Sequence, residues 1–145
     1  MLCAAALSVG SAGIGAAAPS EAGLGGCYRG NVLTGALVPG SGSAGQGVRR
    51  TAEVWDCVSP LLPGVVSGRF EAELPWVGFG SRSQARFIWS DGSVSTASGL
   101  PNTLWTIVDG PAAGHILRFQ LAGNRDGDWY YLTGSAQIES LTFMR

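Results

Sequence analysis

The single histidine, His115, is the first residue to test for nucleophilic catalysis, because an imidazole can activate a serine hydroxyl. Asp109 precedes it and offers a carboxylate, but the chain has no Gly-x-Ser-x-Gly motif to present a nucleophile. Ser90 and Ser93 instead flank an Asp–Gly turn. The sequence therefore favours a protein without enzymatic activity. A hydrolase with a sparse site near His115 and Asp109 is the competing hypothesis.

Paired carboxylates can carry out glycoside hydrolysis, and Glu71 and Glu73 are the pair to consider. They alternate with Phe70 and Leu74, which predicts that the two acids occupy the polar face of a half-buried strand. A solvated surface is the better interpretation of this pair.

A calcium loop is suggested by oxygen side chains at alternate positions of 124–128 (Asn-Arg-Asp-Gly-Asp). The acid that an EF-hand requires at its last ligand position would be Ser135, so that pattern fails. The segment is more typical of a turn rich in Asn and Asp, and we predict no metal and no cofactor.

Exposed aromatic rings on a sheet can bind sugars or other proteins, so the aromatic residues are the next candidates. Trp76 and Tyr130 are the first choices for a binding platform, since Trp76 falls in an expected loop and Tyr130 adjoins a second tyrosine. The other aromatic residues considered are Phe79, Trp105, Trp129 and Tyr131. The expected partner is an extracellular polysaccharide or protein, and the ligand itself stays open.

The cysteines indicate an oxidising compartment. Cys3 would be removed with an N-terminal signal, and Cys27 and Cys57 would then form a disulfide around a loop of about 31 residues. The residues before Cys27 also resemble a bacterial lipobox, which would make Cys27 an acylated N-terminus and leave Cys57 unpaired. An envelope lipoprotein is therefore a further alternative.

Residues 1–22 are predicted to be a signal peptide or a disordered N-terminus, because an uncharged apolar run ends in small residues. Glycines interrupt this run, which argues against a membrane span, and no span is expected in the mature chain. Residues 23–145 are predicted to form one all-β domain that is secreted. The net charge of −1 gives no basic patch for nucleic acid.

The elements that would position these residues are short strands. The segment 86–96 is predicted to be a hairpin with a two-residue turn at Asp91 and Gly92, and with Phe87 and Trp89 on one face. Similar period-two patterns recur along the chain, separated by turn residues. They predict an all-β fold: an antiparallel β-sandwich or a partly open barrel of about eight or nine short strands.

Several of these features occur together in a recognisable layout. It comprises a signal, Cys27-Tyr28-Arg29-Gly30, Cys57, Val66-Ser67-Gly68-Arg69-Phe70, Ala85-Arg86-Phe87-Ile88-Trp89-Ser90-Asp91-Gly92 and Val108-Asp109-Gly110. This layout resembles small, uncharacterised secreted proteins that are abundant in actinobacteria. The resemblance implies export and a β fold, and it implies no catalytic residue.

Overall fold

The computed structural model describes residues 23–39, 46–75, 82–99, 104–123 and 134–144. Nine strands form one antiparallel sheet: β1 (Gly26–Val32), β2 (Ala36–Pro39), β3 (Gln46–Val58), β4 (Ser67–Pro75), β5 (Ser83–Trp89), β6 (Val94–Gly99), β7 (Leu104–Asp109), β8 (Ile116–Leu121) and β9 (Ala136–Met144). The prediction of an all-β fold is confirmed. Within the described ranges, no helix has the length and apolarity needed to span a bilayer.

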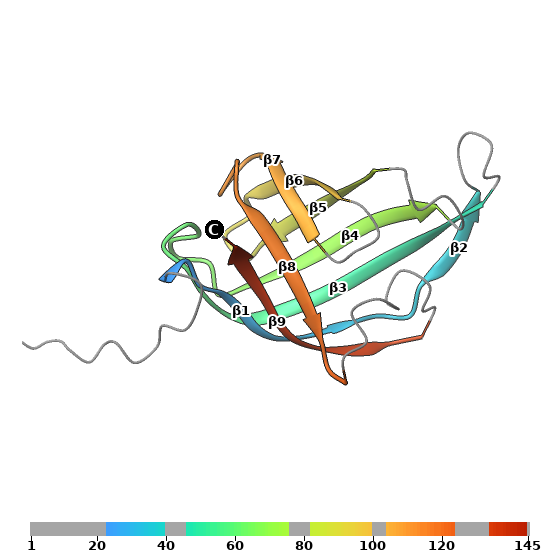
Figure 1. The fold of residues 1–145 in the computed structure, drawn as a ribbon, viewed down its shortest axis with the longest axis horizontal. Helices are drawn as coiled ribbons and strands as arrows, with labels where there is room; N and C mark the ends of the chain where they lie inside the picture. Colours follow the sequence, from blue (N-terminus) through green and yellow to red (C-terminus); the bar gives the residue numbers. More distant parts are fainter. Residues whose placement is uncertain (1–22, 40–45, 76–81, 100–103, 124–133, 145) are drawn as a thin grey trace, which may run out of the picture.

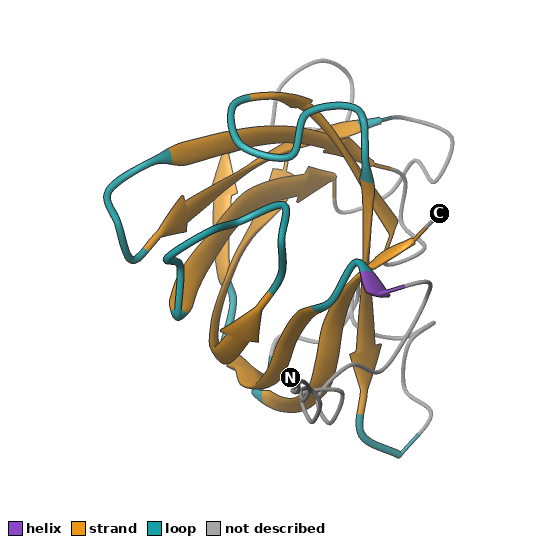
Figure 2. Cartoon of the chain, turned by 90° about the vertical axis from the view of Figure 1, so that its left-hand side faces the viewer, coloured by secondary structure: helices purple, strands orange, loops and turns teal. Residues whose placement is uncertain are grey.

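The sheet closes into a barrel (Figures 1 and 2). From β3 to β9 each strand pairs with the next, and β1 pairs with both β9 and β3. After β1 the chain bends, and β2 pairs with the first part of β3 as the ninth strand. A sandwich or a partly open barrel was therefore the wrong expectation. Period-two patterning shows that each strand buries one face, but stacked sheets and a closed sheet produce the same pattern.

The barrel interior is filled by inward-facing side chains, with an aromatic cluster around Phe70. Its ring centroid lies 5.2 Å from that of Phe87, 5.2 Å from that of Trp105 and 5.1 Å from that of Phe119. Trp89 stacks on Phe87 at 5.3 Å, and its indole nitrogen donates to Ser95 Oγ. These contacts join strands from several sides of the barrel into one core.

One charged residue, Arg50, is fully buried on the inward face of β3. Its Nη2 donates to the backbone oxygen of Gly134, 3.1 Å away, and its side chain packs against Gly35. Burial lowers the pKa of the Arg50 guanidinium, because desolvation disfavours the charged form. Arg50 thus connects β3 to the bend after β1 and to the start of β9.

The predicted disulfide is present between Cys27 and Cys57. The two cysteines are direct partners in the β1–β3 ladder. This is the pairing through which β1 closes the barrel, so the covalent bond reinforces the closure. The same sulfur of Cys27 cannot also carry a lipid thioether, which counts against the envelope lipoprotein.

The hairpin of β5 and β6 is confirmed, and Phe87 and Trp89 share the buried face as predicted. Its turn differs from the prediction. Trp89 N–H donates to Ser93 O, and Gly92 N–H donates to Trp89 O, so three residues form the loop rather than two. Gly92 has φ of 89°, and the Asp91 carboxylate accepts the N–H of Ser93 at 2.9 Å. This is a turn followed by a glycine in the left-handed region, the common three-residue arrangement.

Replacing this glycine tests the turn. We expect Gly92→Val to lower the free energy of unfolding by about 1–3 kcal/mol, because a β-branched residue is strained at positive φ. Open space surrounds the Cβ position, so backbone strain is the cause rather than a clash. Gly92→Asn is the control, since Asn tolerates this region. Equal urea midpoints for the Val and Asn variants would contradict the turn geometry.

Candidate functional site

The residues chosen first as a binding platform, Trp76 and Tyr130, lie outside the described residues. So do the calcium-loop candidate at 124–128 and three further aromatic residues: Phe79, Trp129 and Tyr131. Trp105 is described, and it is fully buried in the barrel core. Its inclusion among candidate platform rings was therefore wrong, because its strand turns it inward beside Phe70.

His115 and Asp109 are not joined by a hydrogen bond in the described structure. His115 lies in the connection between β7 and β8, its Nδ1 is 3.3 Å from the backbone oxygen of Ala112, and its ring meets Phe143 edge-on. The buried hydroxyl of Ser95 donates to the oxygen of Pro111. The geometry assembles no nucleophile–base pair at this histidine among the residues described. Nor do those residues contain a cluster of metal-binding side chains.

Glu71 and Glu73 point outward from β4, as predicted, and both are in ion pairs. Arg49 Nη2 lies 3.0 Å from Glu73 Oε2, while Glu71 accepts Arg86 at 2.9 Å and Arg69 at 3.0 Å. The hydrogen bond from Arg86, and then that from Arg69, hold the pKa of Glu71 below its usual value. These carboxylates therefore form ion pairs between strands on the outer wall of the barrel.

The lowered pKa of Glu71 predicts a pH effect on stability. Because its folded pKa lies below its unfolded pKa, its contribution is present at neutral pH and is lost as the pH falls through the folded value. We expect Glu71→Gln to be less stable than wild type at neutral pH and to approach it in acid. Urea unfolding across this range measures the difference, with Glu73→Gln as a control of equal charge change. A constant difference at all pH values would contradict the assignment.

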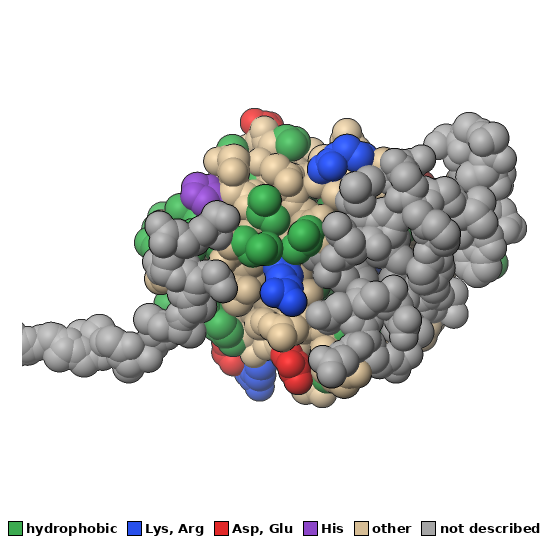
Figure 3. Space-filling view, viewed as in Figure 1, with side chains coloured by type: hydrophobic (Ala, Val, Ile, Leu, Met, Phe, Trp, Pro, Cys, Tyr) green, Lys and Arg blue, Asp and Glu red, His purple; other side chains and the backbone are tan. Residues whose placement is uncertain are grey.

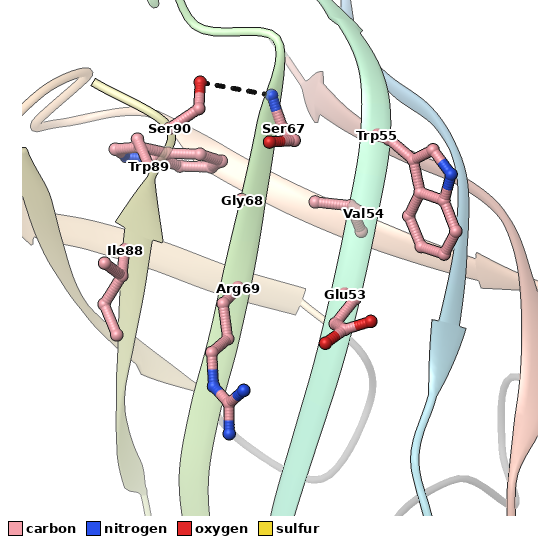
Figure 4. Close-up of a pocket in the computed structure, with 9 residues that line it drawn as sticks. All are labelled: Glu53, Val54, Trp55, Ser67, Gly68, Arg69, Ile88, Trp89 and Ser90. Carbon is pink, nitrogen blue, oxygen red and sulfur yellow. Dashed lines mark hydrogen bonds between the residues drawn. The ribbon is translucent and has the colours of Figure 1, made fainter. Parts of the chain in front are cut away.

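A groove of about 410 Å³ crosses the outer wall near the ends of β3, β4 and β5 that carry the β5–β6 turn. Figure 4 shows the residues that line it: Glu53, Val54, Trp55, Ser67, Gly68, Arg69, Ile88, Trp89 and Ser90. Ser90 Oγ accepts the N–H groups of Val66 and Ser67, which ties the turn to the start of β4. The end of the groove is therefore held by hydrogen bonds between the β5–β6 turn and the start of β4.

The groove is formed over β4 because the residues of this strand that line it, Ser67 and Gly68, have small side chains or none. Gly68 faces the core, and a Cβ at this position would lie 2.5 Å from Cε3 of Trp89. Glycine is thus required by the packing of the inner tryptophan. Next to it, Ser67 adds only a hydroxymethyl group to the outside. The groove consequently runs over β4, where Ser67 and Gly68 are half-buried, between side chains of β3 and β5.

The distinctive side chain at this site is Trp55, which is partly exposed on the outer face of β3. Its cross-strand neighbours are Arg29 on β1 and Ser67 on β4. In Figure 4 the indole ring lies on the side of β3 that faces β1. Arg29 Nε donates to Asp56 Oδ2 at 2.6 Å, and Asp56 adopts a positive φ of 55°. Trp55 therefore has an exposed ion pair at its cross-strand and chain neighbours.

Polar side chains occupy the outward positions of the strands next to Trp55. Asn31 on β1 and Arg69 on β4 lie opposite Glu53, and all three are exposed. By contrast, the face over β7 and β8 shows hydrophobic side chains gathered around one arginine (Figure 3). The wall around Trp55 combines a flat apolar ring with several donors and acceptors.

No family model, curated protein or solved structure matches this chain. The function must therefore be argued from the site itself.

Trp55 did not emerge as a site residue from the sequence. The available signal was its place on the polar side of the period-two pattern in β3, together with Thr51 and Glu53. A tryptophan on the solvent side of an alternating strand is a candidate for ligand binding, because its apolar surface is not buried in the core and so does not stabilise the fold there.

Proposed function

We propose that the protein is an extracellular, non-catalytic carbohydrate-binding module, and that the outer wall around Trp55 is its binding surface. The observation that supports this most strongly is the partly exposed indole of Trp55 at the edge of a groove, with polar side chains on the neighbouring strands. Such a mixture of one flat apolar surface and convergent polar groups is typical of small-molecule sites.

Carbohydrates match these two features together. A sugar ring presents a patch of C–H groups that packs on an aromatic face, while its hydroxyl groups need donors and acceptors at the edge. The indole of Trp55 offers the first, and Asn31 and Ser67 offer the second. A purely apolar partner would leave these polar groups without hydrogen bonds on binding.

The site is also preorganised. Trp55 lies in a strand that is paired on both sides, and the Cys27–Cys57 disulfide and the Arg29–Asp56 ion pair lie beside it. Side chains that are ordered before binding lose less entropy when a ligand arrives. A rigid wall of this kind suits the recognition of a polysaccharide, whose individual contacts are weak.

An extracellular location agrees with the disulfide, since such bonds persist in oxidising compartments. The signal peptide and the relationship to secreted actinobacterial proteins stay predictions. Trp76 and Tyr130 remain candidates for an additional contact surface, as the sequence suggested.

Replacing the central ring tests this function. We expect Trp55→Ala to weaken binding to a recognised polysaccharide at least about tenfold, because an aromatic stacking contact at the centre of a site is lost. Binding is first detected by affinity electrophoresis against insoluble and soluble cell-wall glycans, and is then measured by calorimetry. Leu37→Ala removes an exposed apolar side chain on β2 and is the control. Failure to bind any glycan, or equal affinity in the Trp55 variant, would contradict the proposal.

A further inference from the structure

The carboxylates on the outer wall around the groove differ in one respect: whether an arginine neutralises them. Glu53 has no hydrogen-bond or ion-pair partner within the described part of the chain. The other three are all paired: Asp56 with Arg29, Glu71 with Arg69 and Arg86, and Glu73 with Arg49. Glu53 is thus the carboxylate that lines the groove, and no described arginine neutralises its charge.

The arginine that lies opposite Glu53 in the sheet register points away from it. Arg69 is the cross-strand partner of Glu53, but its Nε donates to Glu71 at 3.0 Å. Figure 4 shows the guanidinium extending along β4, away from the Glu53 carboxylate. Glu71 also accepts Arg86, so it anchors both arginines on the far side of β4 from Glu53.

Glu53 and Trp55 face outward from the same strand. Residues two apart on a strand are separated by roughly 7 Å, a spacing that one sugar unit can bridge. Figure 4 shows the two side chains extending from neighbouring outward positions of β3. A carboxylate attracts a cation directly, and the face of an indole attracts a cation through its electron-rich π system. The two groups therefore select the same kind of ligand.

On the basis of the proposed carbohydrate function, we propose that this site recognises a sugar unit that carries a primary ammonium group. The sugar ring packs on Trp55, and its ammonium donates a charge-assisted hydrogen bond to the Glu53 carboxylate. N-acetylation of the same sugar removes the positive charge and adds an acetyl group. The site therefore discriminates between a free amino sugar and its N-acetylated form.

Two oligosaccharides of equal length test this inference, namely a β-1,4-linked glucosamine oligomer and its fully N-acetylated counterpart. We expect calorimetry on the full secreted protein to show about tenfold tighter binding of the glucosamine oligomer, since charge-assisted hydrogen bonds are stronger than neutral ones. Glu53→Gln should abolish this preference and keep the fold, because the side chain is exposed. Glu73→Gln, which removes a paired carboxylate from the same wall, should retain it.

The outcomes separate the two proposals. Equal affinity for both oligomers in the wild type, or a preference that survives Glu53→Gln, overturns the role of Glu53 and leaves carbohydrate binding intact. A preference for the N-acetylated oligomer overturns it as well. If neither these oligomers nor any other glycan binds to the wild type, the proposed function itself fails, and with it the inference. A preference that is lost in the Glu53 variant and kept in the Glu73 variant supports the assignment.

Discussion

Phe70→Ala is expected to lower the free energy of unfolding by about 3–5 kcal/mol, the largest effect of any single side chain considered for this barrel. Phe70 is fully buried on β4, and its ring meets those of Phe87, Trp105 and Phe119 at centroid distances of 5.1–5.2 Å. Truncation would remove three aromatic contacts at once and leave a cavity that a closed sheet cannot easily collapse to fill. Urea unfolding monitored by tryptophan fluorescence measures the change.

Two further variants show whether the loss comes from this cavity. Phe70→Leu retains much of the buried volume and should cost less than the alanine variant. Val66→Ala removes an apolar side chain that is 63% exposed just before β4 and should change stability little. A Phe70→Ala variant as stable as Val66→Ala would show that the ring does not lie at the centre of the core.

Cys57→Ser is the second large prediction, with an expected loss of about 3–4 kcal/mol in the chain-entropy description of a cross-link. The bond joins β1 to β3, where the sheet closes, so its loss also weakens the barrel at its closing seam. We expect a lower melting temperature and a sharply reduced yield of folded protein.

The control for this effect is the partner cysteine. Cys27→Ser and the double variant should each lose about as much as Cys57→Ser, because all three remove the same bond. Wild-type protein should approach them when a reductant is added. An unchanged melting temperature under reducing conditions, or free thiols at both positions in native protein, would contradict the cross-link.

Strand positions and buried faces could be predicted from the sequence, because period two fixes which side chains share a face. Phe87 and Trp89 in β5, and Leu117 and Phe119 in β8, are buried as their alternation requires. Barrel closure could not be predicted, since it depends on which strands meet at the edges and not on the pattern within any one strand. Long-range pairing of β1 with β9 leaves no local signal.

The site was harder to predict than the fold. Arg50 follows the inward parity of β3, but a buried guanidinium is rare enough that parity alone does not predict it. Trp55 follows the outward parity, yet its neighbours Arg29 and Asn31 come from β1, a strand distant in the chain. Recognition of the groove required the register between β1, β3 and β4. The first aromatic candidates were Trp76, from an expected loop, and Tyr130, from an expected strand with two adjacent tyrosines, and neither choice used the pairing between strands.

The most direct test of the central claim is a nuclear magnetic resonance titration with a bound glycan that follows the indole N–H signals of the five tryptophans. If the outer wall around Trp55 is the binding surface, the Trp55 signal shifts and saturates with ligand, while the signal of Trp105, which is buried and does not line the groove, stays in place. Saturable binding with an unmoved Trp55 signal would contradict the account, because the ligand would then bind elsewhere on the barrel.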